Sequence, residues 1–254
     1  MKGALVLLCA SLVIYFAGVE AMGKYRGLEF LEPCSRRNSH LEACLAHSAN
    51  ILTEHFKRGL PQLGFDEVEP IILDELHIAL GGGPDGYRAQ FRDVEAQGVS
   101  ALRVTGLRAR LTDDEVQVQL ALSIPRIRAK ANYRSSGKLI LVQASGAGDY
   151  WGEYEGVKAK VFIRAKPTPI GGRQYLHLQQ LKMDFSVQNI KMGVENVHDG
   201  NTILQAALNL FINSNSQELL KEMKPDLRRK LVQVMTAFVE KLFAQVPYDA
   251  WIED

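Results

Sequence analysis

The chain is poor in the residues from which catalytic and metal centres are built. It has 3 cysteines and 6 histidines among 254 residues. The histidines are His40, His47, His55, His77, His177 and His198. No two of them form His-x-x-x-His, and the chain has neither a Gly-x-Ser-x-Gly elbow nor a Gly-Lys-Ser/Thr phosphate loop. These absences argue against an enzyme, and we expect no catalytic residue, no metal site and no cofactor.

An excess of charge of one sign is also missing. Lys and Arg number 30 and Asp and Glu 29, so the net charge is +1. A balanced chain lacks the basic footprint of nucleic-acid-binding proteins, so we expect no nucleic acid partner. One strand-like segment presents a basic face with Lys158, Lys160, Arg164 and Lys166. Such a face is typically solvated, and docking of an anionic lipid or partner is the alternative interpretation.

A long hydrophobic run stands only at the N-terminus. Residues 4–17 are almost entirely apolar and follow Lys2. The run is shorter than the roughly 20 residues that span a bilayer, and small residues precede a cleavage point after Ala21. The pattern predicts a signal peptide over residues 1–21, with an uncleaved anchor as the alternative. We therefore expect a secreted, extracellular protein without stable membrane insertion and, since no linker or repeat follows, a single domain over 22–254.

The number and position of the cysteines are consistent with an exported protein. Cys9 lies in the predicted signal peptide, which leaves Cys34 and Cys44. Two cysteines in an exported chain favour one disulfide, which would stabilise the fold by about 2.5–3 kcal/mol through the unfolded state. Two free thiols or half of a metal site are the alternatives.

The first periodic segment is helical. Apolar residues recur every three or four positions from Leu41 to Phe56, which predicts an amphipathic helix over roughly 40–58. Ser39 and Glu42 have the spacing of a capping box. Gly59 and the proline that follows it would end the helix.

The middle of the chain alternates with a period of two. Short Gly-rich connections separate these segments, which favours an antiparallel meander. The alternating apolar positions are Val116 to Ile124, then Ile127 to Tyr133, then Val157 to Ala165, with a looser pattern from Tyr175 to Val187.

The last third returns to helical spacing. One stretch runs from Ile203 to Phe211, and a longer one continues to Leu242. Asn215 can cap the restart, and Pro225 could kink the long helix. A long sheet with one apolar face must cover something, and this helix is the available partner.

Several short pieces of sequence, none diagnostic alone, stand in a characteristic order along essentially the whole mature chain. They are Cys34 with Cys44-Leu45, Arg58 to Gly64, Glu69 to Ile72, Val104 to Leu107, Ile124 to Ile127, Tyr133, Gly137 to Leu141, Gly146 to Gly148, Asn201 to Leu204, Leu208 to Asn213, and Pro225. Together they resemble the takeout/haemolymph juvenile-hormone-binding family of insects. The hormone carriers of that family have a second disulfide, which this chain lacks, so it lies nearer the takeout branch.

The resemblance implies an α+β fold: a long C-terminal α-helix wrapped by a highly curved antiparallel β-sheet, as in tubular lipid-binding proteins, with an apolar internal tunnel. It also implies a secreted carrier for a terpenoid hormone-like or fatty-acyl ligand. A receptor or tissue acceptor would be a further partner, and we expect a monomer.

The expected ligand-binding residues are the inward members of the alternating strands and of the long-helix stripe. They are Val116, Val118, Leu120, Leu122, Tyr133, Val161, Ile163, Phe211, Met235, Phe238 and Leu242. Met183, Met192 and Met223 could add adaptable lining. Plain core packing is the alternative for each, because apolar periodicity does not separate core from cavity wall.

A second function remains open. It is a partner-binding, signalling or immune lipid-recognition protein on the same fold, with a filled, structural core. Aromatic bulk at the inward strand positions would favour it, whereas these positions hold mainly Val, Ala, Leu and Ile.

Overall fold

The computed structural model describes residues 30–67, 69–80, 86–139, 142–143, 145–197 and 202–253. The predicted signal peptide, 1–21, lies outside these ranges. The elements are β1 Cys34–Ser35, α2 Leu41–Phe56, η1 Pro61–Leu63, β2 Ile71–Leu80, β3 Tyr87–Gln97, η2 Val99–Ala101, β4 Arg103–Leu111, β5 Val116–Ser136, β6 Lys138–Leu139, β7 Val142–Gln143, β8 Gly146–Ile170, β9 Arg173–Ser186, β10 Asn189–Glu195, α3 Thr202–Ser214, α4 Ser216–Gln245, η4 Tyr248–Ala250 and β11 Ile252–Glu253.

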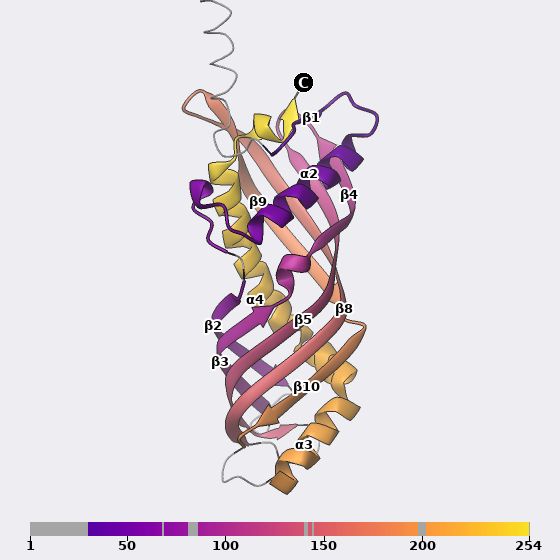
Figure 1. The fold of residues 1–254 in the computed structure, drawn as a ribbon, viewed down its shortest axis with the longest axis vertical. Helices are drawn as coiled ribbons and strands as arrows, with labels where there is room; N and C mark the ends of the chain where they lie inside the picture. Colours follow the sequence, from indigo (N-terminus) through magenta and orange to yellow (C-terminus); the bar gives the residue numbers. More distant parts are fainter. Residues whose placement is uncertain are drawn as a thin grey trace, which may run out of the picture.

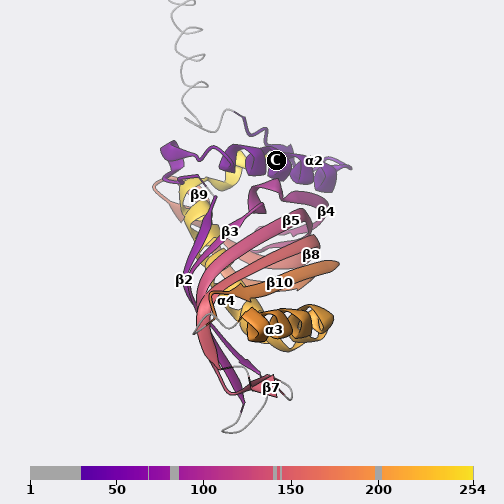
Figure 2. The same ribbon diagram turned by 60° about the horizontal axis from the view of Figure 1, so that its bottom comes forward.

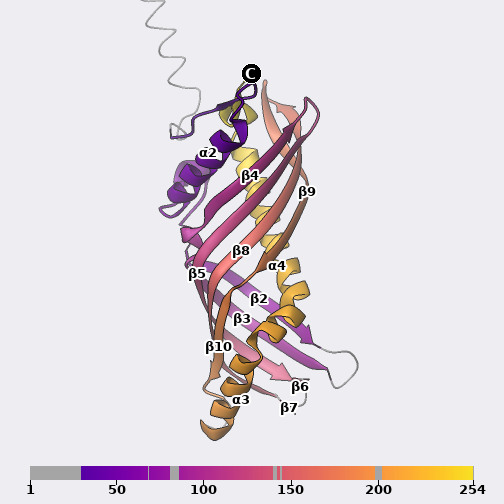
Figure 3. The same ribbon diagram turned by 90° about the vertical axis from the view of Figure 1, so that its right-hand side faces the viewer.

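One antiparallel sheet of seven strands dominates the molecule. Its strand order is β10-β8-β5-β3-β2, with β4 also paired to β5 and β9 also paired to β8. The sheet curls along the 30-residue helix α4, which contacts β9, β2 and β10 (Figures 1 and 3). The predicted arrangement of a long C-terminal helix and a curved antiparallel sheet is confirmed.

Strands β5 and β8 form the spine of the sheet, and their buried faces switch at one point. Along β5 the buried positions are even-numbered up to Ile124 and odd-numbered from Ala131. The ladder is interrupted where Pro125, which has no N–H, lies opposite Gly156. Gly156 has φ 61°, a left-handed conformation that glycine adopts at little cost. A single irregular position thus exchanges the two faces of both strands.

The apolar interior is continuous along the molecule. Four clusters of buried side chains follow one another, and neighbouring clusters share a partly buried aromatic residue. Phe185 packs against the first and third clusters, Phe243 against the third and fourth, and Trp251 against the fourth and second. These shared aromatic residues join the four clusters into one elongated core.

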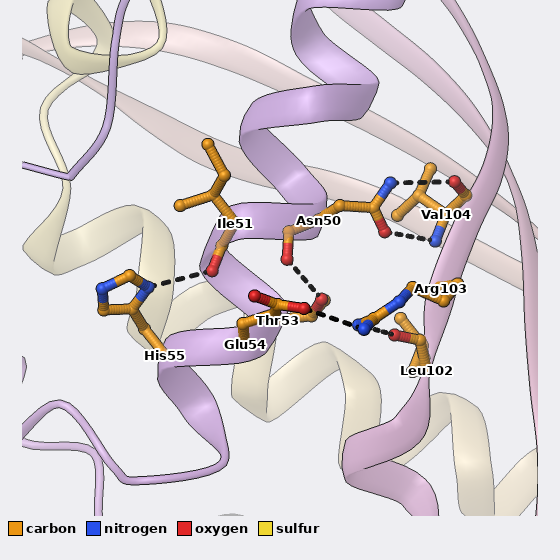
Figure 4. A network of polar contacts seen from close by, with 8 residues as sticks. All are labelled: Asn50, Ile51, Thr53, Glu54, His55, Leu102, Arg103 and Val104. Carbon is orange, nitrogen blue, oxygen red and sulfur yellow. Dashed lines mark hydrogen bonds and ion pairs between the residues drawn. The ribbon is translucent and has the colours of Figure 1, made fainter.

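Asparagine side chains fasten helices to both edges of the sheet. On β4, Val104 donates its N–H to Asn50 Oδ1 at 2.8 Å, and its carbonyl accepts from Asn50 Nδ2 at 3.0 Å (Figure 4). On β10, Asn209 and Asn213 make the same two-way bonds to Val194 and Met192. Figure 2 shows α2 across β4 and α3 beside β10. The amides satisfy edge-strand groups that would otherwise be exposed for pairing.

The terminal segments meet at one end of the molecule. β1 pairs with β11 in parallel, with Cys34 opposite Ile252. The predicted disulfide joins Cys34 to Cys44, with an S–S distance of 1.98 Å. It therefore links β1 to the first turn of α2.

Two predicted helix caps are wrong. The Ser39–Glu42 capping box does not form, because Glu42 Oε1 accepts the N–H of Ala109 on β4 at 3.1 Å and α2 begins without a side-chain cap. Asn215 also makes no cap bond and instead donates from Nδ2 to the carbonyl of Phe211 at 2.8 Å. Helix α4 continues through Pro225.

The Asn50 contact has a measurable contribution. Asn50→Ala leaves the N–H and the carbonyl of Val104 without their partner, so the free energy of unfolding should fall by about 1–3 kcal/mol. Thr53→Ala is the control, since Thr53 Oγ1 bonds only to the Asn50 carbonyl of its own helix. Urea denaturation measures both. Equal losses in the two variants would contradict the role of the Asn50 amide.

The face switch in β5 and β8 can be tested at Gly156. An added Cβ there would combine a left-handed backbone with approaches of 2.6 Å to Gln188 Oε1 and 2.8 Å to its Cβ. We expect Gly156→Ala to cost about 2–3 kcal/mol of unfolding free energy. Gly171→Ala is the control: its φ is 58° but nothing lies within 4 Å, so it should cost about 1 kcal/mol. If Gly156→Ala lost no more unfolding free energy than Gly171→Ala, this role of Gly156 would be contradicted.

Candidate ligand-binding site

A small apolar cavity of about 50 Å³ lies between the sheet and the N-terminal half of α4. It is walled by side chains of β2, β3, β5, β8, β10, α3 and α4. The lining residues are Ile78, Leu80, Tyr87, Ala89, Phe91, Tyr133, Tyr150, Met192, Val194, Ile212, Leu219 and Met223.

The register of the sheet brings the strand residues of this wall together. Leu80 pairs with Tyr87, and Ile78 with Ala89, across β2 and β3. Phe91 pairs with Tyr133 across β3 and β5. Because side chains alternate along a strand, these residues all face the same side of the sheet. The strand part of the cavity wall therefore follows directly from the alternation of residues along the strands.

Tyrosine hydroxyls are the principal polar groups near the cavity. Tyr150 Oη and Tyr154 Oη hydrogen-bond to each other, and Tyr150 Oη also donates to Met192 Sδ at 3.6 Å. The Tyr150 ring meets Phe91 edge-on, with ring centroids 5.1 Å apart. The two hydroxyls are thus satisfied inside the apolar interior, which buried polar groups require.

Burial keeps these phenols protonated. It raises the pKa of Tyr87 and Tyr154, raises that of Tyr150 well above its ordinary value, and raises that of Tyr133 to about 12. The site consequently offers neutral hydroxyls in an apolar setting, suited to orienting an apolar molecule with few polar atoms.

The predicted wall residues are spread along the whole interior. Tyr133 lines the cavity, and Phe211 packs against the same cluster. Leu120, Leu122, Val161, Ile163 and Met235 belong to the next cluster along α4. Val116 and Val118 belong to the cluster near β11, and Leu242 to the one under α2. Phe238 is 36 % exposed, and its ring packs against Phe65 at 5.2 Å.

Most of the cavity wall was not among the predicted site residues. Met192 and Met223 line it, whereas Met183 lies in the neighbouring cluster, and a role in ligand lining stays a prediction. The alternation of Ile78 with Leu80, and of Tyr87 with Ala89 and Phe91, was the available signal for β2 and β3. Tyr150 carries no such signal, because Gly148 and Gly152 flank it at the inward positions.

Two other classes of site are absent from the described ranges. No three His, Cys, Asp or Glu side chains gather there in an arrangement that could hold a metal ion. No helix of that part of the chain is long and apolar enough to cross a membrane.

The geometry defines a class of protein: an α+β fold in which one long helix and a curled antiparallel sheet enclose a continuous apolar interior. The sequence matches the family described as "Haemolymph juvenile hormone binding protein" over residues 5–253. The chain belongs to this family.

Relatives and a solved structure agree with this assignment. The chain is 24 % identical over 230 residues to the "Circadian clock-controlled protein daywake" of Drosophila melanogaster, covering 88 % of each chain. It is 21 % identical over 196 residues to the "Putative beta-carotene-binding protein" of Schistocerca gregaria, covering 76 % of each. The crystal structure of Epiphyas postvittana Takeout 1 superposes with a TM-score of 0.76 at 17 % identity, covering 88 % of this chain and 100 % of that one. The last comparison supports the fold.

The buried tyrosines predict a loss of stability at alkaline pH. An unfolded tyrosine has a pKa near 10, whereas that of Tyr133 is about 12. Between these values the unfolded chain releases a proton that the folded chain keeps, so stability present below pH ~10 is lost as pH rises. Tyr133→Phe should reduce this decline by on the order of 2 kcal/mol. Urea unfolding of both proteins from about pH 9 to 12 measures it; identical declines would contradict the assignment.

Proposed function

We propose that the protein is a secreted carrier that holds a small hydrophobic ligand in an internal tunnel. Membership of a family of hormone-binding proteins supports a role in binding rather than catalysis. The observation that carries the proposal is the continuous apolar interior beside α4, with a cavity whose polar groups are mostly neutral tyrosine hydroxyls.

Binding on this proposal requires the wall to move. Ligand pockets of small-molecule carriers have volumes of roughly 300–1,000 Å³, and the cavity measures about 50 Å³. Met192 and Met223 are unbranched and adapt to new shapes at low cost. A ligand that displaced them would extend past Phe185 toward the second half of the interior. Predicted wall residues such as Leu122 and Val161 would then line the tunnel.

Desolvation supplies enough free energy for such a complex. Burial of roughly 350 Å² of apolar ligand surface contributes on the order of 9 kcal/mol. Immobilisation of the ligand offsets several kcal/mol of this free energy. Micromolar or somewhat tighter affinity, near −8 kcal/mol, is therefore expected for an optimal ligand.

The ligand we propose is elongated and nearly devoid of polar atoms, such as a terpenoid or a fatty-acyl chain. The locust relative named for β-carotene binding supports a long isoprenoid skeleton. The family's haemolymph description and the apolar N-terminal run support export after removal of residues 1–21. Delivery by a monomer to a receptor or tissue acceptor completes the proposal.

One observation favours a second candidate function. The side chains of Tyr150 and Tyr154 lie over Gly152, and Tyr150 also lines the cavity. This is aromatic bulk at inward positions, which a partner-binding, signalling or immune lipid-recognition protein with a merely structural core would have.

Filling the cavity separates the two functions. Met192→Trp should weaken binding of an environment-sensitive lipid probe by at least about tenfold, because the added volume removes ligand space. Met192→Leu, which conserves volume, should bind nearly as the parent does. Ala89→Leu repeats the test from the opposite wall. Circular dichroism confirms folding of each variant.

Native mass spectrometry and organic extraction of the purified protein complete this test. A co-purified lipophile, or a probe displaced by terpenoids or fatty acids, supports the carrier. A folded protein that carries no lipophile and ignores every probe would overturn it and leave the partner-binding function.

A further inference from the structure

The outer face of the sheet carries an unusual row of side chains across β4, β5, β8 and β9. Register places Arg108 opposite Gln119, Gln119 opposite Phe162, and Phe162 opposite Lys182. The residues that alternate with this row along the strands, such as Val161, point inward and are buried in the core. The row therefore lies on the side away from the proposed tunnel. Figure 3 shows these four strands side by side with α4 behind them.

A hollow of about 630 Å³ lies over this face. Its floor is formed where Gly106 stands opposite Ala121, next to an irregularity in the pairing of β4 with β5. These two small residues leave space that larger side chains would fill. Phe162, half-buried, and Lys160 border the hollow from β8.

Positive charge predominates in and around the hollow, which is lined by Arg108, Lys160 and Lys182 together with Asp184. Six exposed cations occupy the outer positions of the four strands, and we call them the basic rim: Arg108, Arg110, Lys158, Lys160, Lys166 and Lys182. Within the described ranges, none of the six forms an ion pair. From the sequence, only the part of this surface that lies on β8 was predicted, as the basic face of a single strand.

Two acidic groups on or beside these strands, Asp184 and Glu115, are already engaged in ion pairs. Asp184 pairs with Lys224 of α4 at 2.8 Å, and Glu115 pairs with Arg164 at 3.8 Å. The chain as a whole has a net charge of only +1. Positive charge is therefore concentrated on this face, where like charges repel and contribute nothing evident to the fold.

We propose that this hollow is the docking site for an acidic segment of a protein partner. Carboxylates of the segment would meet the basic rim, and an apolar or aromatic side chain would pack on Phe162 above Gly106 and Ala121. Charge complementarity of this kind guides encounter and fixes the docked orientation.

The hollow favours a protein segment over an anionic membrane. Strands lie about 4.8 Å apart, so the four-strand face is about 14 Å wide. A bilayer is flat on that scale and would touch the edges of a hollow without filling its floor, whereas a peptide segment can enter it. The floor also offers Phe162, a contact suited to a side chain.

A binding assay with a labelled peptide that alternates glutamate with tyrosine tests the proposal. The mature protein should bind it with an affinity that falls steeply as salt is added. The double variant Lys160→Glu/Lys182→Glu should lose at least about tenfold in affinity. Lys130→Glu/Lys191→Glu is the matched control, with the same change in net charge on strand residues of the other half of the sheet; it should lose less than about threefold.

Two results would overturn the proposal: equal weakening in both double variants, or no peptide binding at all. Binding to phosphatidylserine vesicles that Lys160→Glu/Lys182→Glu abolishes, with peptide binding unaffected, would assign the face to membranes instead. The lipid probe of the interior separates this inference from the proposed carrier function, because its binding should be unchanged in both double variants.

Discussion

The pairing of β5 with β8 is the constraint on which the rest of the molecule depends. It runs from Val116 opposite Ala165 to Ser135 opposite Gly146, broken only at Pro125 and Gly156. Without the exchange of faces at that point, apolar residues of one half would point to solvent. With it, a single pair of strands presents an apolar face to α4 along both halves, while β4 and β9 extend one half and β3, β2 and β10 extend the other.

Two consequences follow for function. Because one helix closes both halves, the buried clusters of the two halves meet at Phe185, and apolar contacts run from one half to the other. Because the strands alternate, every inward apolar residue leaves an outward neighbour free to vary. The cations of the basic rim, which lie around Phe162, occupy such outward positions. On the two proposals, the inward face of the sheet would bind an apolar ligand and the outward face an acidic segment, with β5 and β8 contributing to both sites.

The sequence was sufficient where periodicity decides the structure. The apolar sets at Val116 to Ile124 and Ile127 to Tyr133 already contained the exchange of faces, since the alternation changes from even to odd numbers. The first helix, predicted over roughly 40–58 and observed at 41–56, the Cys34–Cys44 disulfide and the family were also predicted. The predicted capping box does not form because Glu42 instead accepts the N–H of Ala109, which is distant in the sequence. No local sequence pattern indicates such a competing bond. The cavity wall was largely missed because alternation separates inside from outside, whereas a void depends on how side chains from seven elements fill one space.

The composition of that wall shows where room for a ligand can arise. Val, Ile and the paired aromatics are stiff and are fixed by the strand ladder. Met192 and Met223 are not, and they reach the cavity from β10 and α4. Backbone movement is resisted at β10, where Asn209 and Asn213 hold α3 through both N–H and carbonyl groups. On the proposed carrier function, expansion would therefore come mainly from rearrangement of the two methionine side chains, and a bound molecule would be selected by its length and width more than by polar contacts.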